Sequence, residues 1–114
     1  MAYEKLVLVG NLGEDPELRS ANGKPVTSFS VAVNKKISGQ KSTTWWRCTV
    51  WNANAEVAAQ YLKKGSKVLV EGSNIRASAY VGKDGQPHAS LELTADRVVF
   101  LDSAPEDDAD SPAF

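Results

Sequence analysis

The chain has 114 residues, of which 42% are hydrophobic and 24% are charged, a composition typical of one globular domain. Its single cysteine, Cys48, excludes an internal disulfide, favours a reducing compartment and leaves no cysteine pattern for zinc. The net charge of −1 by itself argues against a polyanion as the partner.

The charge is distributed unevenly along the chain. Residues 102–114 contain five acids and no base, so residues 1–101 carry 13 bases against 9 acids. This asymmetry predicts a folded, mildly basic domain over residues 1–101 and a disordered acidic tail over residues 102–114. The first residues show no signal-peptide pattern, and the apolar run at 6–9 is too short to span a bilayer. We therefore expect a cytoplasmic protein without membrane contact.

The first half of the sequence predicts three strands. Residues 5–10 form a short continuous apolar run, which is typical of a buried strand. Asn22-Gly23 is a strong hairpin signal, and apolar residues alternate with polar or small ones over the following segment, 26–34. A polar, basic stretch at 35–43 predicts a loop, and the third strand begins after it.

One helix is expected between the third and fourth strands. Asn52 or Asn54 can cap its start, apolar residues recur at helical spacing over 57–62, and Gly65 ends it. Two further strands follow, the first over 67–81 and the second from His88 to Leu101. This order predicts an all-β fold with one helix, namely a five-stranded Greek-key barrel of the OB type.

The third strand contains all three tryptophans. Alternate side chains of a strand point to opposite faces, so Trp46 lies on an apolar face that suits the core. The other face combines two large rings, a cation and a hydroxyl, from Trp45, Arg47, Thr49 and Trp51. Tryptophans also fill cores, but rings beside a cation favour a surface on which unpaired bases stack next to their phosphates.

Other candidate residues carry weaker signals. Lys35 and Lys36 lie just before the tryptophans, where cations suit a phosphate backbone, although loop lysines are usually plain solvated charge. Tyr80 fits a stacking ring and an ordinary half-buried tyrosine equally well. His88, the only histidine, is interpreted as a surface residue. The sequence shows no catalytic set of residues, no metal ligands and no motif for a cofactor.

The acidic tail has a composition of its own. Its acids include Asp107, Asp108 and Asp110, and an apolar pair, Pro112 and Phe114, follows them. Acidic segments commonly only increase solubility. An aromatic residue after a run of acids is also typical of a peptide that a basic pocket captures.

These segments together resemble the family of bacterial single-stranded DNA-binding proteins. The opening Lys5-Leu-Val-Leu-Val-Gly-Asn-Leu-Gly-Glu-Asp-Pro-Glu-Leu-Arg19 is similar to the opening of that family. Trp45-Trp-Arg47, the helix end at 61–66 and Val-Glu-Gly at 70–72 follow in the same order and spacing. The likeness covers residues 4–101, and the acidic end with its proline and phenylalanine is similar to the family's tail.

The resemblance implies an OB fold, a homotetramer (or else a dimer) and binding of single-stranded DNA without strong sequence preference. It implies a nucleoid-associated role in DNA replication, recombination and repair, with the tail recruiting partner proteins. It also implies DNA contacts at seven aromatic or basic positions: Lys5, Arg19, Trp45, Arg47, Trp51, Arg76 and Tyr80.

Three alternatives remain open. A replication-restart accessory protein has the same fold, but that class tends to lack an acidic tail with an aromatic end. An enzyme built on an OB barrel needs a catalytic set of residues, which the sequence lacks. A pure assembly protein would use the tryptophan face as a protein interface, and a mass measurement with and without an oligonucleotide separates that case.

Overall fold

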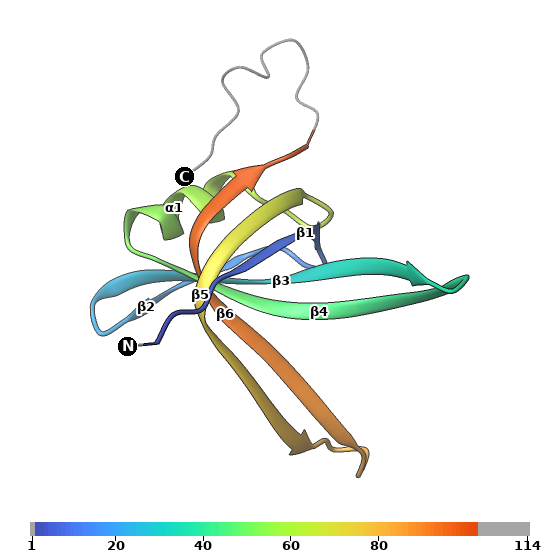
Figure 1. Ribbon diagram of the computed structural model, residues 1–114. Helices are drawn as coiled ribbons and strands as arrows, with labels where there is room; N and C mark the ends of the chain where they lie inside the picture. The colour runs from blue at the N-terminus through green and yellow to red at the C-terminus, as the bar shows by residue number, and fades with distance from the viewer. Residues whose placement is uncertain (1, 103–114) are drawn as a thin grey trace.

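The computed structural model describes residues 2–102. These residues form six strands and one helix along the chain (Figure 1). The elements are β1 (Leu6–Leu12), β2 (Glu17–Ala21), β3 (Lys24–Ile37), β4 (Gln40–Trp51), α1 (Ala53–Tyr61), β5 (Lys67–Val81) and β6 (Pro87–Phe100). Within this part of the chain, no helix is long and apolar enough to cross a membrane.

Five of the strands close into a barrel. In sheet order, β1 pairs with β5, β5 with β6, β6 with β4 and β4 with β3, and β3 pairs back to β1 at Asn11 and Leu12. The β4–β6 pairing is parallel and the others are antiparallel. The helix lies between the third and fourth barrel strands. The predicted all-β fold with one helix and a five-stranded OB barrel is confirmed.

The inner faces of the strands supply one hydrophobic core. Phe29, Cys48 and Val50 are fully buried in it, and Trp46 packs against it partly buried, as the alternation in the sequence predicts. Helix α1 is joined to the barrel by a buried hydrogen bond, in which the Thr27 hydroxyl donates to the carbonyl oxygen of Ala55 at 2.6 Å. The core therefore packs against the inner side of β4.

The hairpins β3–β4 and β5–β6 extend beyond the barrel as two arms (Figure 1). The predicted loop over 35–43 is wrong, because the strands of the first arm continue until only Ser38 and Gly39 remain between them. Both residues have positive φ, 50° and 81°, and such two-residue turns match the twist of the flanking strands. Lys35 and Lys36 therefore stand on a strand.

Three further differences concern strand β2 and the two ends of the helix. Strand β2 is an addition to the five predicted strands, because the predicted Asn22-Gly23 turn folds it back onto β3. Asn52 occupies the N-cap position with φ of 63° but makes no side-chain capping bond. The helix ends at Tyr61, and Leu62 is already extended, so Gly65 lies beyond the helix instead of ending it.

The buried thiol of Cys48 leads to a prediction. Burial raises its pKa from 9.0 to about 12, so the folded protein at about pH 8 is expected to resist thiol-reactive dyes that label it quickly in urea. The folded pKa exceeds the unfolded one. The contribution of the buried neutral thiol to the free energy of unfolding is therefore complete below pH 9.0 and is lost as the pH rises toward about 12. Labelling kinetics with and without urea check this, and rapid labelling of the native protein contradicts it.

Candidate nucleic-acid interface

The outer face of β4 presents the predicted binding side chains. Trp45 and Trp51 are 53% and 39% exposed, and Arg47 is exposed between them. On the inner face of the same strand, Cys48 and Val50 are fully buried and Trp46 is partly buried. The division of this strand into a polar aromatic face and a core face is thus confirmed.

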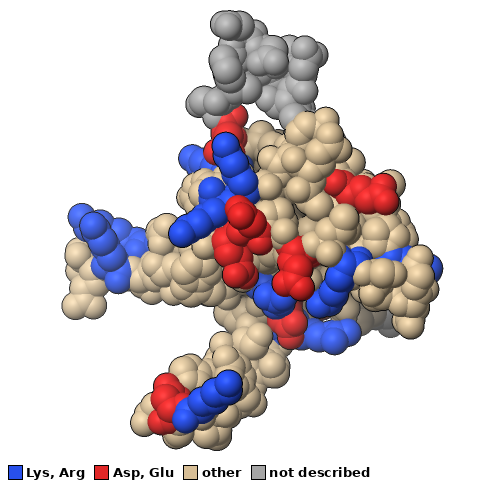
Figure 2. Space-filling view, turned by 180° about the vertical axis from the view of Figure 1, so that it is seen from behind, with Lys and Arg blue, Asp and Glu red and all other residues tan. Residues whose placement is uncertain are grey.

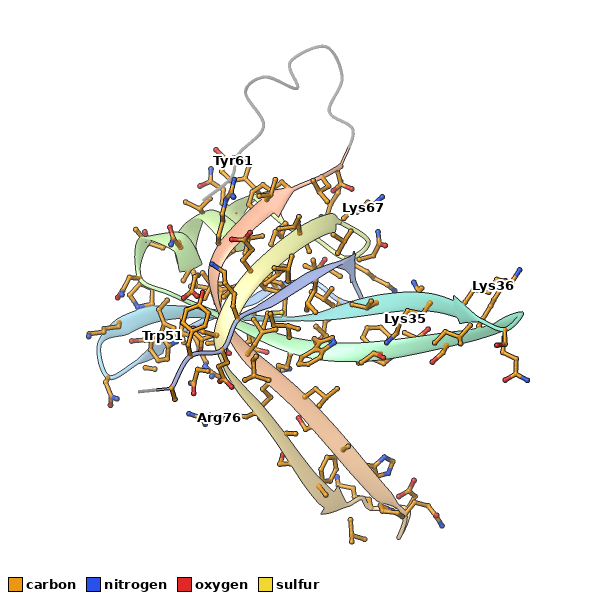
Figure 3. The ribbon with its side chains drawn as sticks, viewed as in Figure 1. Lys35, Lys36, Trp51, Tyr61, Lys67 and Arg76 are labelled. Carbon is orange, nitrogen blue, oxygen red and sulfur yellow. The ribbon has the colours of Figure 1, made fainter. Side chains whose placement is uncertain are left out.

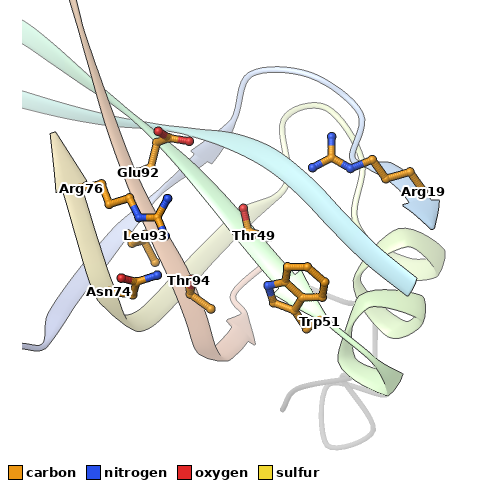
Figure 4. A pocket seen from close by; sticks show the side chains of 8 residues that line it. All are labelled: Arg19, Thr49, Trp51, Asn74, Arg76, Glu92, Leu93 and Thr94. Atoms are coloured by element: carbon orange, nitrogen blue, oxygen red, sulfur yellow. The ribbon is translucent and has the colours of Figure 1, made fainter. Parts of the chain in front are cut away.

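A first groove brings together three of the predicted residues. Arg19 comes from β2, Trp51 from β4 and Arg76 from β5, and Figure 4 shows the three side chains around one hollow, with Thr49 between the two arginines. We call this hollow the Trp51 groove; its other lining residues are Thr49, Asn74, Glu92, Leu93 and Thr94. Its volume is about 240 Å³, below the roughly 300 Å³ at which small-molecule sites begin. A groove this small and open suits one segment of a long polymer better than a whole small molecule enclosed by the protein.

A second groove brings together three more. Trp45 and Arg47 project from β4, and Tyr80 from the β5–β6 arm. We call this hollow the Trp45 groove; it is completed by Ser30, Trp46, Ala89, Ser90 and Leu91. Gly13 touches the Trp45 ring so closely that a Cβ there would lie 2.4 Å from it, so the backbone after β1 supports the ring.

Strand pairing joins the two grooves. Arg47 stands beside Glu92 in the β4–β6 pairing, and Glu92 stands beside Arg76 in the β5–β6 pairing. Neighbouring residues in adjacent strands share a face of the sheet. The outer face therefore carries a row of cation, carboxylate and cation that crosses from β4 through β6 to β5 and joins the Trp45 groove to the Trp51 groove.

Lys35 and Lys36 lie apart from both grooves, on the β3–β4 arm. With Lys41 they line a shallow hollow near its end, and Figure 2 shows basic side chains gathered on this arm without an acidic one among them. Figure 3 shows both lysines on the arm, well away from Trp51 and Arg76. The arm extends the basic surface outward from the barrel.

Lys5 is the predicted residue that the structure leaves outside the grooves and the arms. Its ammonium lies 3.7 Å from a carboxylate oxygen of Glu71, and it lines a fourth hollow together with Tyr3, Glu4 and Asp96. The acids around it reduce its attraction for phosphate. The structure therefore gives less support to Lys5 than to the other eight sites predicted in the domain.

The predicted contacts in the tail fall outside the described residues. These are Asp107, Asp108, Asp110, Pro112 and Phe114. Among residues 2–102, no group of three or more histidine, cysteine, aspartate or glutamate side chains is placed to hold a metal ion.

Three residues that line the grooves escaped the sequence analysis, and a fourth at their margin was interpreted only as a surface residue. Asn74 and Glu92 line the Trp51 groove, Ser90 lines the Trp45 groove, and His88 stacks on Tyr80. The polar alternation of His88, Ser90 and Glu92 along β6 was the available signal. It marks one face of a strand, but pairing with β4 and β5 is needed to show that this face meets the tryptophans.

The chain matches known proteins over nearly its whole described length. The single-strand binding protein family matches residues 3–101. The single-stranded DNA-binding protein of Chlamydia trachomatis is 38% identical over 90% of this chain, and that of Neisseria meningitidis is 37% identical over 98%. The matched regions span 65% and 67% of those two proteins, so the chain covers about two thirds of their length.

A solved structure gives the same answer for the fold. The SSB of Plasmodium falciparum in complex with ssDNA superposes with a TM-score of 0.72 and 28% identity, covering 90% of this chain and 97% of that one. These matches agree with the closed barrel and with the exposed aromatic face of β4. The chain belongs to the single-strand binding protein family.

Proposed function

We propose that this protein binds single-stranded DNA without strong sequence preference and has no catalytic role of its own. The observation that carries the proposal is the outer face of β4, where Trp45 and Trp51 are exposed beside arginines. Every base has a face that stacks on an aromatic ring, and cations track the phosphates whatever the sequence. The names of the relatives, and the ssDNA in the Plasmodium falciparum complex, support the choice of ligand.

A fluorescence titration tests this function. Bases in a duplex are stacked on each other and cannot cover Trp45 and Trp51, so a dT oligonucleotide should quench tryptophan emission at far lower concentration than a matched duplex does. Affinity should fall linearly with salt on a logarithmic plot, because bound phosphates release counterions. Equal affinity for duplex would contradict the proposal. An incubation of labelled strand with magnesium, followed by gel analysis, separates a binder from a nuclease.

The cellular setting that we propose follows from this activity. A binder that accepts any base is suited to cover single strands exposed during replication, recombination and repair. It would act in the cytoplasm at the nucleoid. Depletion of the protein in its host is expected to slow replication and to raise sensitivity to DNA damage.

We also propose that the chain assembles, as a homotetramer or otherwise as a dimer. Val7 and Val9 are exposed on the outer face of β1, beside the half-buried Leu69 of β5. The second edge of β1 meets β3 only at Asn11 and Leu12. An apolar strand with a partly open edge favours pairing with another chain. Light scattering at micromolar concentration should show the multimer, and a monomer there contradicts it.

For the acidic segment after the domain, we propose a role in recruiting partner proteins. The support is its composition, five acids together with Pro112 and Phe114. A pull-down from bacterial lysate with the full chain and with Phe114→Ala tests this. Replication and repair proteins should be lost from the variant, whereas identical partner lists would leave the segment as solubilising charge.

Replacing the Glu92 carboxylate is expected to strengthen the binding of single-stranded DNA. Its carboxylate lines the Trp51 groove and stands next to Arg47 and Arg76 in the strand pairing, where it repels phosphate. Glu92→Gln is expected to tighten binding to single strands about three- to tenfold at low salt, and less at high salt. Titrations at several salt concentrations check this. Glu56→Gln, on the helix, is the control and should change little; a weaker Glu92→Gln variant would show that this carboxylate is needed.

A further inference from the structure

We propose that His88 is a positioning residue for Tyr80, and that Asp84 in turn orients His88. The proposal rests on the proposed binding of single-stranded DNA, and it assigns a role to the histidine that the sequence suggested was a plain surface residue. All three side chains lie at the outer end of the β5–β6 arm, beyond the barrel.

The two rings form a stacked pair. Tyr80 and His88 stand directly opposite each other in the β5–β6 pairing, their ring centroids are 5.4 Å apart, and their planes differ by 25°. Tyr80 nevertheless remains 55% exposed and lines the Trp45 groove. The imidazole therefore supports the phenol ring while leaving much of its surface available to a base.

The turn of the arm holds the imidazole from its other side. His88 Nε2 lies 3.2 Å from Oδ1 and 3.3 Å from Oδ2 of Asp84. Asp84 Oδ1 also accepts a hydrogen bond from the backbone N–H of Gln86 at 2.9 Å. The N–H of Gln86 and the His88 ring lower the pKa of the Asp84 carboxyl, which favours the ionised acceptor that this arrangement requires.

A glycine makes room for the imidazole. A Cβ at Gly82 would lie 2.7 Å from two atoms of the His88 ring, so any larger residue would push the ring away. Within this turn, Asp84 thus supplies a carboxylate beside the His88 ring, and Gly82 leaves space for the ring.

The consequence concerns the cost of binding. A side chain that stacks on a base must give up rotamer freedom, and a ring that is already ordered gives up less. Tyr80 projects from a two-stranded arm, where the barrel core cannot hold it. The His88 ring and the Asp84 carboxylate order the Tyr80 ring instead.

A double-mutant cycle on the full chain tests the proposal. His88→Ala should weaken binding to a dT oligonucleotide about two- to tenfold, the range of an aromatic pair. The same change in a Tyr80→Ala background should have no further effect. His88→Phe keeps a ring but loses the contact with Asp84, so it should restore part of the affinity. Gln86→Ala is the matched control in the same turn, because its backbone N–H remains, and it should bind like wild type.

Three outcomes would overturn the proposal. An equal loss of affinity in both backgrounds would mean that His88 contacts DNA independently. No loss of affinity in His88→Ala would mean that Tyr80 needs no support. A His88→Phe variant that binds no better than His88→Ala would rule out stacking. The NMR shifts of the Tyr80 ring in the DNA-free protein give an independent reading. They should change in His88→Ala and Asp84→Asn, and unchanged shifts reject the contact whether or not the protein binds DNA.

Discussion

Replacing Trp51 or Trp45 by alanine is expected to weaken binding of single-stranded DNA by about 1–3 kcal/mol in each case. Both rings are exposed, so their truncation removes a stacking platform and leaves the core unchanged. Thermal unfolding of these two variants should resemble that of wild type. Titrations with dT oligonucleotides in moderate salt measure the effect, with emission followed from the remaining tryptophans.

Trp46→Ala is the matched control on the same strand. Its ring packs against the core and contributes only part of its surface to the Trp45 groove, so the variant should lose about 3–5 kcal/mol of unfolding free energy. The loss of DNA affinity in the protein that stays folded should be smaller than in Trp45→Ala. A Trp46→Ala variant with unchanged stability and weak DNA binding would mean that the two faces of β4 have the opposite roles.

Much of this arrangement could be predicted from local patterns in the sequence. Alternation places Trp46 inward and Trp45 outward whatever the rest of the fold does, because a strand has a period of two. Asn22-Gly23 predicts its turn for an equally local reason, since both residues tolerate positive φ. The single helix between strands, together with the strand count, was enough to indicate the closed barrel.

The missed features depend on pairing between distant segments. Nothing near Glu92 in the sequence shows that it stands between Arg47 and Arg76; the β4–β6 and β5–β6 pairings create that row. The stack of His88 on Tyr80 likewise requires the register of the β5–β6 arm.

The β3–β4 arm was missed for a different reason. Its strand residues near the turn are polar except for the exposed Ile37, so the segment lacks the apolar alternation by which a strand is recognised. The Ser38-Gly39 turn is a weaker signal than Asn-Gly, yet its backbone is of the same kind. Strands that project beyond a barrel have no core to face, and their sequence loses the pattern by which strands are recognised.

The second large effect is expected from the arginines. Arg47 and Arg76 are the two ends of the row that joins the grooves, and we expect each to neutralise a phosphate of a strand that stacks on Trp45 and Trp51. For single strands, each phosphate contact adds about 0.7 to the magnitude of the slope of log affinity against log salt. Arg47→Ala and Arg76→Ala should each remove about that amount, and the double variant should remove about twice as much.

The loss of affinity should be largest at low salt and should shrink as salt rises, because the lost interaction is with a charge that salt screens. Lys67→Ala is the matched control, since Lys67 lies at the far end of the barrel from Arg76 in Figure 3. It should leave both slope and affinity close to wild type. If Lys67→Ala reduces the slope as much as Arg76→Ala does, the DNA path is diffuse around the barrel. A slope that stays unchanged in the double arginine variant would mean that the strand runs elsewhere, with Lys35 and Lys36 on the β3–β4 arm the next positions to test.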